Sequence, residues 1–221
     1  MNFVPKINRR SFFIGTAAVG GGMALGLDFA VGPNVVRAAD GSPEVGVWVV
    51  IRPDNTTVIR IARSEMGQGT LTGLAQLVAE ELECDWSKVT TEYPTPGENV
   101  ARKRAWGAFS TGGSRGIRES EKYVREGGAA ARTMLVQAAA NEWKVPASEC
   151  TATNSTIKHT SGKTVTYGKV AEAAAKLEVP KDVKLKDPKD WKIAGKPLLR
   201  LDTADKVIGK MEYGIDDKLP G

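Results

Sequence analysis

The residues from 57 to 83 change from strand periodicity to helix periodicity across a loop with two glycines. Apolar residues alternate over positions 57–62, which is typical of a strand. Over positions 70–83 they recur every three or four residues, which predicts a helix with one apolar face. The segment between them, Glu65-Met66-Gly67-Gln68-Gly69-Thr70, therefore joins a strand to a helix, and the chain must fold with both kinds of element.

This first loop is a candidate binding site. Its backbone amides and the N-terminus of the following helix point toward one space, which suits an anion such as a phosphate. Gly67 and Gly69 let the backbone approach a ligand closely, while the Gln68 amide offers a donor and an acceptor to a heterocycle or oxo group. A plain turn capped by Thr70 explains the same residues equally well, because glycine and threonine also serve turns and caps.

A second loop with two glycines precedes another helical stretch, expected over residues 117–143. Its hydroxyl groups and glycines, with one arginine, place several donors close together, as a phosphate or pterin would need. The alternative is a flexible connection in which Ser114 caps the helix. The candidate binding residues here are Ser110, Thr111, Gly112, Gly113 and Ser114.

The rest of the pattern predicts an α+β fold. Pro53-Asp54-Asn55 reads as the turn of a hairpin, and the pair Gly127 and Gly128 is a weak point where the long helix could kink. Further expected elements are strands at 45–52, 89–93, 151–154 and 156–158, a polar connection at 95–115, and a strand end followed by a helix at 165–176.

The first 38 residues have the composition of a twin-arginine signal peptide. Arg9 and Arg10 precede an apolar segment at 12–30, and Val36-Arg37-Ala38 offers a cleavage site. Such signals export folded proteins, so we expect a periplasmic location. A retained membrane anchor is the alternative, although glycines and Asp28 would make a weak span.

Charge and cysteine content exclude several function classes. Residues 1–38 hold four positive charges and one negative, so the net charge falls from +5 to +2 without them, too little to indicate nucleic-acid binding. Cys84 and Cys150 lack C-x-x-C partners, and His159 is the only histidine, so the chain alone builds no usual zinc, haem or iron-sulfur site. The two cysteines either form a disulfide or remain separate, half-buried thiols.

Together the two loops resemble the molybdopterin-binding domain of xanthine oxidase family large subunits. The likeness rests on residues 65–89 and on the loop from Ser110 to Arg115, and it continues through 127–132, 143–150 and 186–203. The branch most resembled is that of isoquinoline 1-oxidoreductase beta subunits and exported aldehyde dehydrogenases, which also begin with a twin-arginine leader. The resemblance implies a signal peptide at 1–38, a partial molybdopterin-binding domain at 39–185, and the start of an α/β-hammerhead-like domain at 186–221.

The resemblance also implies an activity. Family members hydroxylate a small aldehyde or N-heterocycle with water-derived oxygen, using molybdenum and molybdopterin, here expected as the cytosine dinucleotide. Electrons leave through iron-sulfur clusters on a small partner subunit, with a cytochrome c as a further candidate partner. Gln68 would lie near the molybdenum oxo group and the pterin, and the 110–114 loop would bind the pterin or phosphate portion. The side that the Arg115 guanidinium faces is not fixed by the resemblance.

Family subunits are several times longer than this chain, and their catalytic glutamate lies near the C-terminal end. We therefore expect that base beyond residue 221, no catalytic residue or metal ligand within the chain, and the remainder of the large subunit as a partner. A truncated sequence and one part of a split subunit are both compatible with this. Glu65 is expected to support its loop, and Glu80 and Glu81 to be solvated. A non-catalytic pterin-nucleotide-binding or assembly module, or an exported structural domain, are the alternatives.

Overall fold

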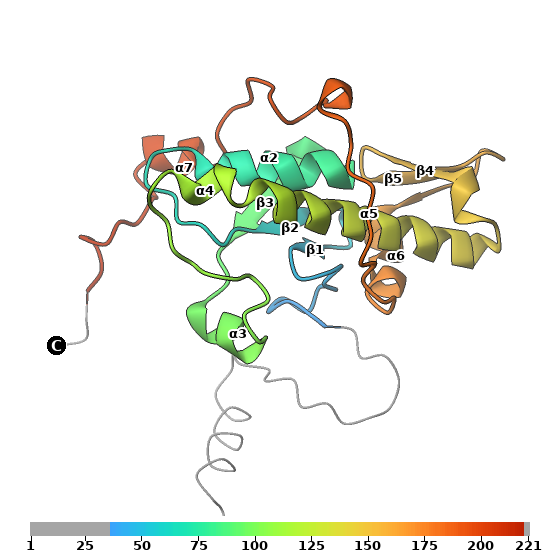
Figure 1. Cartoon of the computed structure of the whole chain (residues 1–221), viewed down its shortest axis with the longest axis horizontal. Coiled ribbons are helices and arrows are strands. Elements are labelled where there is room, and N and C mark those ends of the chain that lie inside the picture. The colour runs from blue at the N-terminus through green and yellow to red at the C-terminus, as the bar shows by residue number, and fades with distance from the viewer. Residues whose placement is uncertain (1–35, 219–221) are drawn as a thin grey trace, which may run out of the picture. The chain divides into compact units, whose positions relative to one another are not determined.

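The computed structural model describes residues 36–218 and contains two three-stranded sheets with helices packed on them (Figure 1). This mixture confirms the predicted α+β class, while most of the predicted signal peptide lies outside the described residues. The strands are β1 (Val49–Ile51), β2 (Thr57–Arg60), β3 (Val89–Glu92), β4 (Cys150–Thr153), β5 (Thr156–His159) and β6 (Thr164–Thr166). The helices are α2 (Thr70–Leu82), α3 (Pro96–Ala101), α4 (Arg115–Arg118), α5 (Glu121–Trp143), α6 (Tyr167–Ala174) and α7 (Thr203–Val207), with single 3-10 turns at Trp86–Lys88, Ala147–Glu149 and Pro188–Asp190.

The first sheet has the strand order β1-β2-β3 and places the first glycine loop. β1 pairs antiparallel with β2, which confirms the predicted hairpin, and Asn55 in its turn has a φ of 68°. β3 runs parallel to β2, so α2 forms the crossover that parallel strands require. The loop before α2 therefore lies at the carboxyl end of β2.

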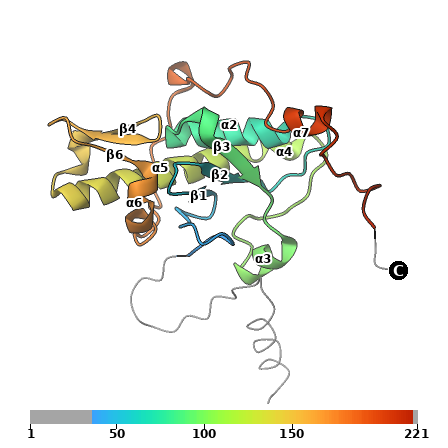
Figure 2. The same ribbon diagram turned by 180° about the vertical axis from the view of Figure 1, so that it is seen from behind.

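Helices α2 and α5 lie side by side against this sheet in both views (Figures 1 and 2). A Cβ on Gly128 would lie 2.5 Å from the carbonyl oxygen of Val78, and one on Gly127 would lie 2.4 Å from the Trp48 ring. Both glycines thus permit close packing within a helix assigned without interruption, and the kink suggested for them is not needed. The helical run breaks earlier, at Glu119 and Ser120 between α4 and α5.

The strands of the second sheet lie close to where the sequence predicted them, whereas the connection at 95–115 differs from its prediction. β4, β5 and β6 are antiparallel, and Asn154 and Ser155 form the tight turn with φ values of 48° and 56°. The polar connection expected at 95–115 contains α3, which was not predicted. Its signal was present, because Thr95 and Glu98 form a reciprocal capping box at the helix start.

The cysteines are separate buried thiols rather than a disulfide. Burial raises the pKa of the Cys84 thiol to about 12, so this thiol stays protonated at neutral pH. In residues 36–218 no group of three or more His, Cys, Asp or Glu side chains is placed to hold a metal ion. Within the same residues, every helix is too short or too polar to cross a membrane.

An irregular segment, residues 186–202, lies along α2 in both views and is called the strap here (Figures 1 and 2). Three polar side chains, spaced four residues apart on α2, bind the strap's backbone: Thr72, Gln76 and Glu80. The Thr72 hydroxyl accepts a hydrogen bond from the Leu201 N–H at 3.1 Å, and the Gln76 amide donates to the carbonyl oxygens of Ile193 and Lys196 at 3.2 Å.

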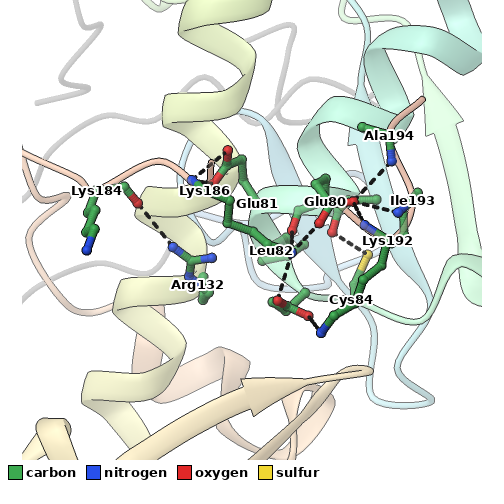
Figure 3. Close-up of polar contacts among 12 residues, drawn as sticks. Glu80, Glu81, Leu82, Cys84, Arg132, Lys184, Lys186, Lys192, Ile193 and Ala194 are labelled. Carbon is green, nitrogen blue, oxygen red and sulfur yellow. Dashed lines mark hydrogen bonds and ion pairs between the residues drawn. The ribbon is translucent and has the colours of Figure 1, made fainter. Parts of the chain in front are cut away.

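Glu80 forms the strongest of these attachments. Its carboxylate accepts hydrogen bonds from the N–H groups of Lys192 (2.9 Å), Ile193 (2.6 Å) and Ala194 (3.0 Å), and it pairs with the Lys186 ammonium (Figure 3). Its carboxylate supplies the acceptor that these amides would otherwise find in a sheet or helix.

The expectation that Glu80 and Glu81 are solvated is wrong, since they are only 2% and 0% exposed. Glu81 accepts a hydrogen bond from the Lys186 N–H at 3.0 Å and forms an ion pair with Arg125 at 2.8 Å. Both carboxylates are therefore buried with charge partners, as a buried charge requires. The domain boundary placed at residue 186 stays a prediction.

Replacing Glu80 by glutamine tests the strap's attachment. E80Q removes the charge facing Lys186 and the three amides, so we expect the free energy of unfolding to fall by about 2 kcal/mol, the scale of a buried charge-assisted hydrogen bond. Hydrogen exchange should accelerate selectively at residues 192–194. E142Q, at an exposed position of α5, is the control and should change neither quantity. Unaltered exchange at 192–194 in E80Q would contradict the attachment.

Candidate functional site

The first glycine loop is organised by the carboxylate of Glu65. Its Oε1 accepts hydrogen bonds from the N–H groups of Gly67 (2.7 Å) and Gly69 (2.9 Å), and its Oε2 from that of Leu71 (3.0 Å). Such amides suit an external anion, but in the described structure the chain's own carboxylate binds them, and the assignment of Gly67 and Gly69 to cofactor binding stays a prediction. The expected role of Glu65 as a support of its loop is confirmed.

Two glycines give this loop its path. Gly67 and Gly69 have φ values of 97° and 82°, in the region that other L-residues rarely adopt. Gly69, which has no side chain, is the N-cap residue of α2, so the suggested Thr70 cap is wrong. A Cβ on either glycine would meet no atom within 4 Å, which leaves the outer side of the loop open.

Gln68 closes the loop from the exposed side. Its Oε1 accepts a hydrogen bond from the Met66 N–H at 2.5 Å, and its Nε2 donates to the carbonyl oxygen of Ser64 at 2.9 Å. A primary amide has two donor and two acceptor positions, so one of each remains for a ligand. The assignment of Gln68 to cofactor binding stays a prediction.

The strap reaches the same loop through Arg200. Its Nη1 donates to the carbonyl oxygen of Gly67 at 3.0 Å, and its Nη2 lies 3.1 Å from the Glu65 carboxylate. Asp202 holds the guanidinium by two bonds of 2.9 Å, and hydrogen bonding from Arg200 keeps the pKa of Asp202 well below its usual range. The strap therefore stabilises the loop conformation as well as covering α2.

The second glycine loop lies against the first. The Ser64 N–H donates to the Thr111 hydroxyl at 2.9 Å, and the buried Arg63 guanidinium donates to the carbonyl oxygen of Ser110. A Cβ on Gly116 would lie 2.8 Å from the Thr70 hydroxyl, so α4 packs closely on the start of α2. The structure thus brings the two predicted loops side by side.

The second loop presents three successive backbone donors. Gly113 and Ser114 both have φ values of 56°, and the N–H groups of Gly112, Gly113 and Ser114 have no hydrogen-bond partner among the described residues. Successive amides of this kind suit an anion. The suggested Ser114 cap is wrong, because its side chain makes no capping hydrogen bond. Arg115 faces this loop, donating to the Ser110 hydroxyl at 3.1 Å and to the carbonyl oxygen of Gly112 at 3.3 Å.

Arg63 and Arg200 were not among the residues predicted from the sequence. Arg63 carried a readable signal, since a charged residue between a buried strand and a glycine loop is unusual and calls for a partner. Arg200 carried none, because its contacts with Gly67 and Glu65 join residues more than 130 positions apart.

Comparison with known proteins identifies a domain family. The model of the molybdopterin cofactor-binding domain matches residues 6–206. The chain is 31% identical to the membrane-bound aldehyde dehydrogenase [pyrroloquinoline-quinone] of Gluconacetobacter polyoxogenes, over 98% of the chain and 28% of that protein. It is 27% identical to the beta subunit of isoquinoline 1-oxidoreductase of Brevundimonas diminuta, over 98% of the chain and 32% of that protein. The chain thus spans less than a third of these relatives' length.

Solved structures show weaker similarity. Quinoline 2-oxidoreductase from Pseudomonas putida 86 aligns with 62% of this chain and 17% of its own, at 19% identity and a TM-score of 0.44. The Cu,Mo-CO dehydrogenase in its carbon monoxide reduced state aligns with 57% of this chain and 15% of its own, at 22% identity and a TM-score of 0.41.

Replacing Glu65 by glutamine tests the loop's internal anion. Burial opposes ionisation of Glu65, but the amides of Gly69, Leu71 and Gly67 and the charge of Arg200 outweigh it and hold its pKa below the ordinary value of a glutamate. Because the pKa of Glu65 is lower in the folded than in the unfolded state, the charge stabilises the fold at pH values above the unfolded-state pKa. This stabilisation is lost as the pH falls through the folded-state pKa. The free energy of unfolding of the wild type should therefore exceed that of E65Q by less and less as the pH falls from about 6 to about 3.

The measurement is urea unfolding across that pH range, together with hydrogen exchange of the amides at 67, 69 and 71, which should be faster in E65Q at neutral pH. E119Q removes an exposed carboxylate from the end of α4 and serves as the control. A wild-type advantage that is independent of pH would show that the Glu65 charge does not hold the loop.

Proposed function

The chain belongs to the molybdopterin cofactor-binding domain family, and we propose on this basis that it forms part of the cofactor-binding subunit of an oxidoreductase. The proposed reaction hydroxylates an aldehyde or N-heteroaromatic substrate with oxygen from water. The bound molybdenum cofactor would supply the redox chemistry, and the protein would supply binding and orientation.

The observation that carries this proposal is the contact between the two glycine loops. Each loop is open on one side, and each offers donors of a different kind. The second loop presents the free amides of 112–114, hydroxyl groups and the Arg115 guanidinium, which fit a phosphate group. The first presents the remaining donor and acceptor of Gln68, which fit the edge of a heterocycle. A pterin nucleotide contains both groups.

The catalytic base is proposed to lie outside this chain. Glu65, Glu80 and Glu81 each accept hydrogen bonds from backbone amides and pair with a cation. Such contacts occupy the oxygens that would accept a proton, and they lower the pKa values of Glu65 and Glu80. We therefore propose that the base within hydrogen-bond reach of the reacting water comes from another part of the complete protein.

The proposed substrate class rests on the names of the relatives, and the proposed partners rest on the family resemblance. Those names specify an aldehyde dehydrogenase and an isoquinoline 1-oxidoreductase. We propose a small aldehyde or N-heterocycle as substrate, the remainder of the large subunit and a small iron-sulfur subunit as partners, and a cytochrome c as a further electron acceptor. The proposed cofactor form is the cytosine dinucleotide. One relative's name specifies pyrroloquinoline quinone instead, so the cofactor itself needs direct analysis.

We propose a periplasmic location reached by the twin-arginine route. The support is the pair Arg9 and Arg10 before an apolar segment. Export of a folded protein is compatible with cofactor loading in the cytoplasm.

Replacing Gln68 by alanine tests the proposed orientation of the cofactor. In the complete complex, Q68A should lower turnover by about tenfold or more, the effect of losing one buried hydrogen bond to a bound group. Molybdenum per polypeptide should also fall, while helix content by circular dichroism should not. Q137A, at an exposed position of α5, is the matched control. Unchanged turnover together with unchanged molybdenum content would remove Gln68 from the site.

A further inference from the structure

The leader cleavage site predicted at residues 36–38 lies within a turn of the folded domain. The carbonyl oxygen of Val36 accepts a hydrogen bond from the Glu44 N–H at 2.9 Å. The Ala38 N–H donates to the carbonyl oxygen of Ser42, also at 2.9 Å. A protease pairs its own backbone with an extended substrate strand. At this site the chain's own residues 42–44 already take that place.

The bond that a leader peptidase would cut, between Ala38 and Ala39, lies at the tip of this turn. The Ala38 carbonyl oxygen accepts a hydrogen bond from the Gly41 N–H at 2.9 Å. Gly41 has a φ of 81°, so the tip uses a backbone conformation that favours glycine. A peptidase must bind the same carbonyl oxygen in its oxyanion hole before it can cleave the bond, so the turn competes with the enzyme.

Two ion pairs attach the turn to separate parts of the domain, one from each side of the scissile bond. Before the bond, the Arg37 guanidinium lies 2.6 Å from the Glu172 carboxylate of α6. After the bond, the Asp40 carboxylate lies 2.7 Å from the guanidinium of Arg52, directly after β1. Each pair is partly exposed and contributes little alone. Together with the backbone pairing, they hold both arms of the turn against the domain.

The buried part of the domain begins directly after the tip. Ser42 is 8% exposed, Glu44 is 5% exposed and pairs with the buried Arg60, and Val45 is 0% exposed. Residues 39–41 alone separate the scissile bond from this buried segment. A protease needs extended, accessible chain on both sides of the bond it cuts. Access to the bond after Ala38 therefore requires part of the domain to open.

The leader side of the bond also contributes to the fold. Cleavage after Ala38 would remove the Val36 carbonyl oxygen and leave the Glu44 N–H without that acceptor. It would also remove Arg37, the partner of Glu172. The domain thus uses groups that a processed chain would lack.

We propose that the folded domain protects this site, so that the exported protein keeps residues 1–38 as a membrane anchor. The twin-arginine route exports folded proteins, so the leader peptidase meets the turn after it has formed. The apolar segment at 12–30 then stays attached to the domain. The membrane location rests on the proposed export, whereas protection of the bond rests on the contacts of residues 36–44.

The test is digestion of the leader-bearing complex by purified leader peptidase in detergent micelles. The complete complex is purified from cells that lack the twin-arginine translocase, and cleavage after Ala38 is followed by intact mass. The folded complex should be cut at least about tenfold more slowly than a synthetic peptide of residues 25–50. Equal rates overturn the proposal. An uncut peptide also overturns it, because the sequence rather than the fold would then prevent cleavage.

The double variant G41A/E172Q weakens the turn. It places alanine at a left-handed position and removes the partner of Arg37. Because cleavage follows the population of the open turn, its rate should rise by about tenfold. The peptide carrying G41A should be cut at the wild-type rate. A faster cut of that peptide would assign the effect to the sequence and overturn the proposal.

The matched control is G162A/E142Q. Gly162 also has a positive φ, 91°, with no atom within 4 Å of an added Cβ, and Glu142 is an exposed carboxylate on α5. This control should be cut as slowly as the wild-type complex. An equal acceleration in the control, or an unchanged rate in G41A/E172Q, overturns the proposal.

The intact mass of the complex isolated from normal cells separates this proposal from the proposed function. An exported, membrane-bound complex that retains its leader supports both. An exported complex that begins at Ala39 overturns the proposal. A complex confined to the cytoplasm contradicts the proposed export, and the digestion rates then still decide whether the fold protects the site.

Discussion

The close approach of α2 and α5 is the constraint on which the site depends. Each helix follows one of the glycine loops, directly in the case of α2 and through α4 in the case of α5. Only glycine at position 128 lets the α5 backbone come so near the Val78 carbonyl oxygen. A wider spacing would separate the loops and break the contact between Ser64 and Thr111. The packing of two helices therefore sets the geometry of a polar site at their ends.

In the irregular segments, side-chain carboxylates accept the backbone hydrogen bonds that carbonyl oxygens accept in helices and sheets. Glu65 accepts hydrogen bonds from backbone amides of the first loop, and Glu80 and Glu81 accept them from backbone amides of the strap. Irregular backbone near a core needs hydrogen-bond partners as much as a strand does. Arg200 joins the two systems, because it lies on the strap and contacts both Glu65 and Gly67. Loop conformation and strap attachment are thus parts of one network.

Local signals predicted most of the fold, and long-range contacts account for what was missed. Periodicity located the first hairpin, α2 and the second sheet, because each depends on residues close in sequence. Even the unpredicted α3 had a local signal in Thr95 and Glu98. By contrast, the burial of Glu80 depends on a strap more than 100 residues later, and the role of Gly128 depends on a neighbouring helix. The sequence correctly predicted that each loop precedes a helix. It did not predict that the two loops contact each other or that Arg63 takes part in this contact.

Elemental and cofactor analysis of the native complex purified through this chain would show whether the paired loops belong to a molybdopterin site. Molybdenum, a released pterin nucleotide and iron should be present in stoichiometric amounts, with the remaining polypeptides identified by mass spectrometry. An intact, folded complex that contains neither molybdenum nor pterin, or that contains pyrroloquinoline quinone in their place, would contradict the account.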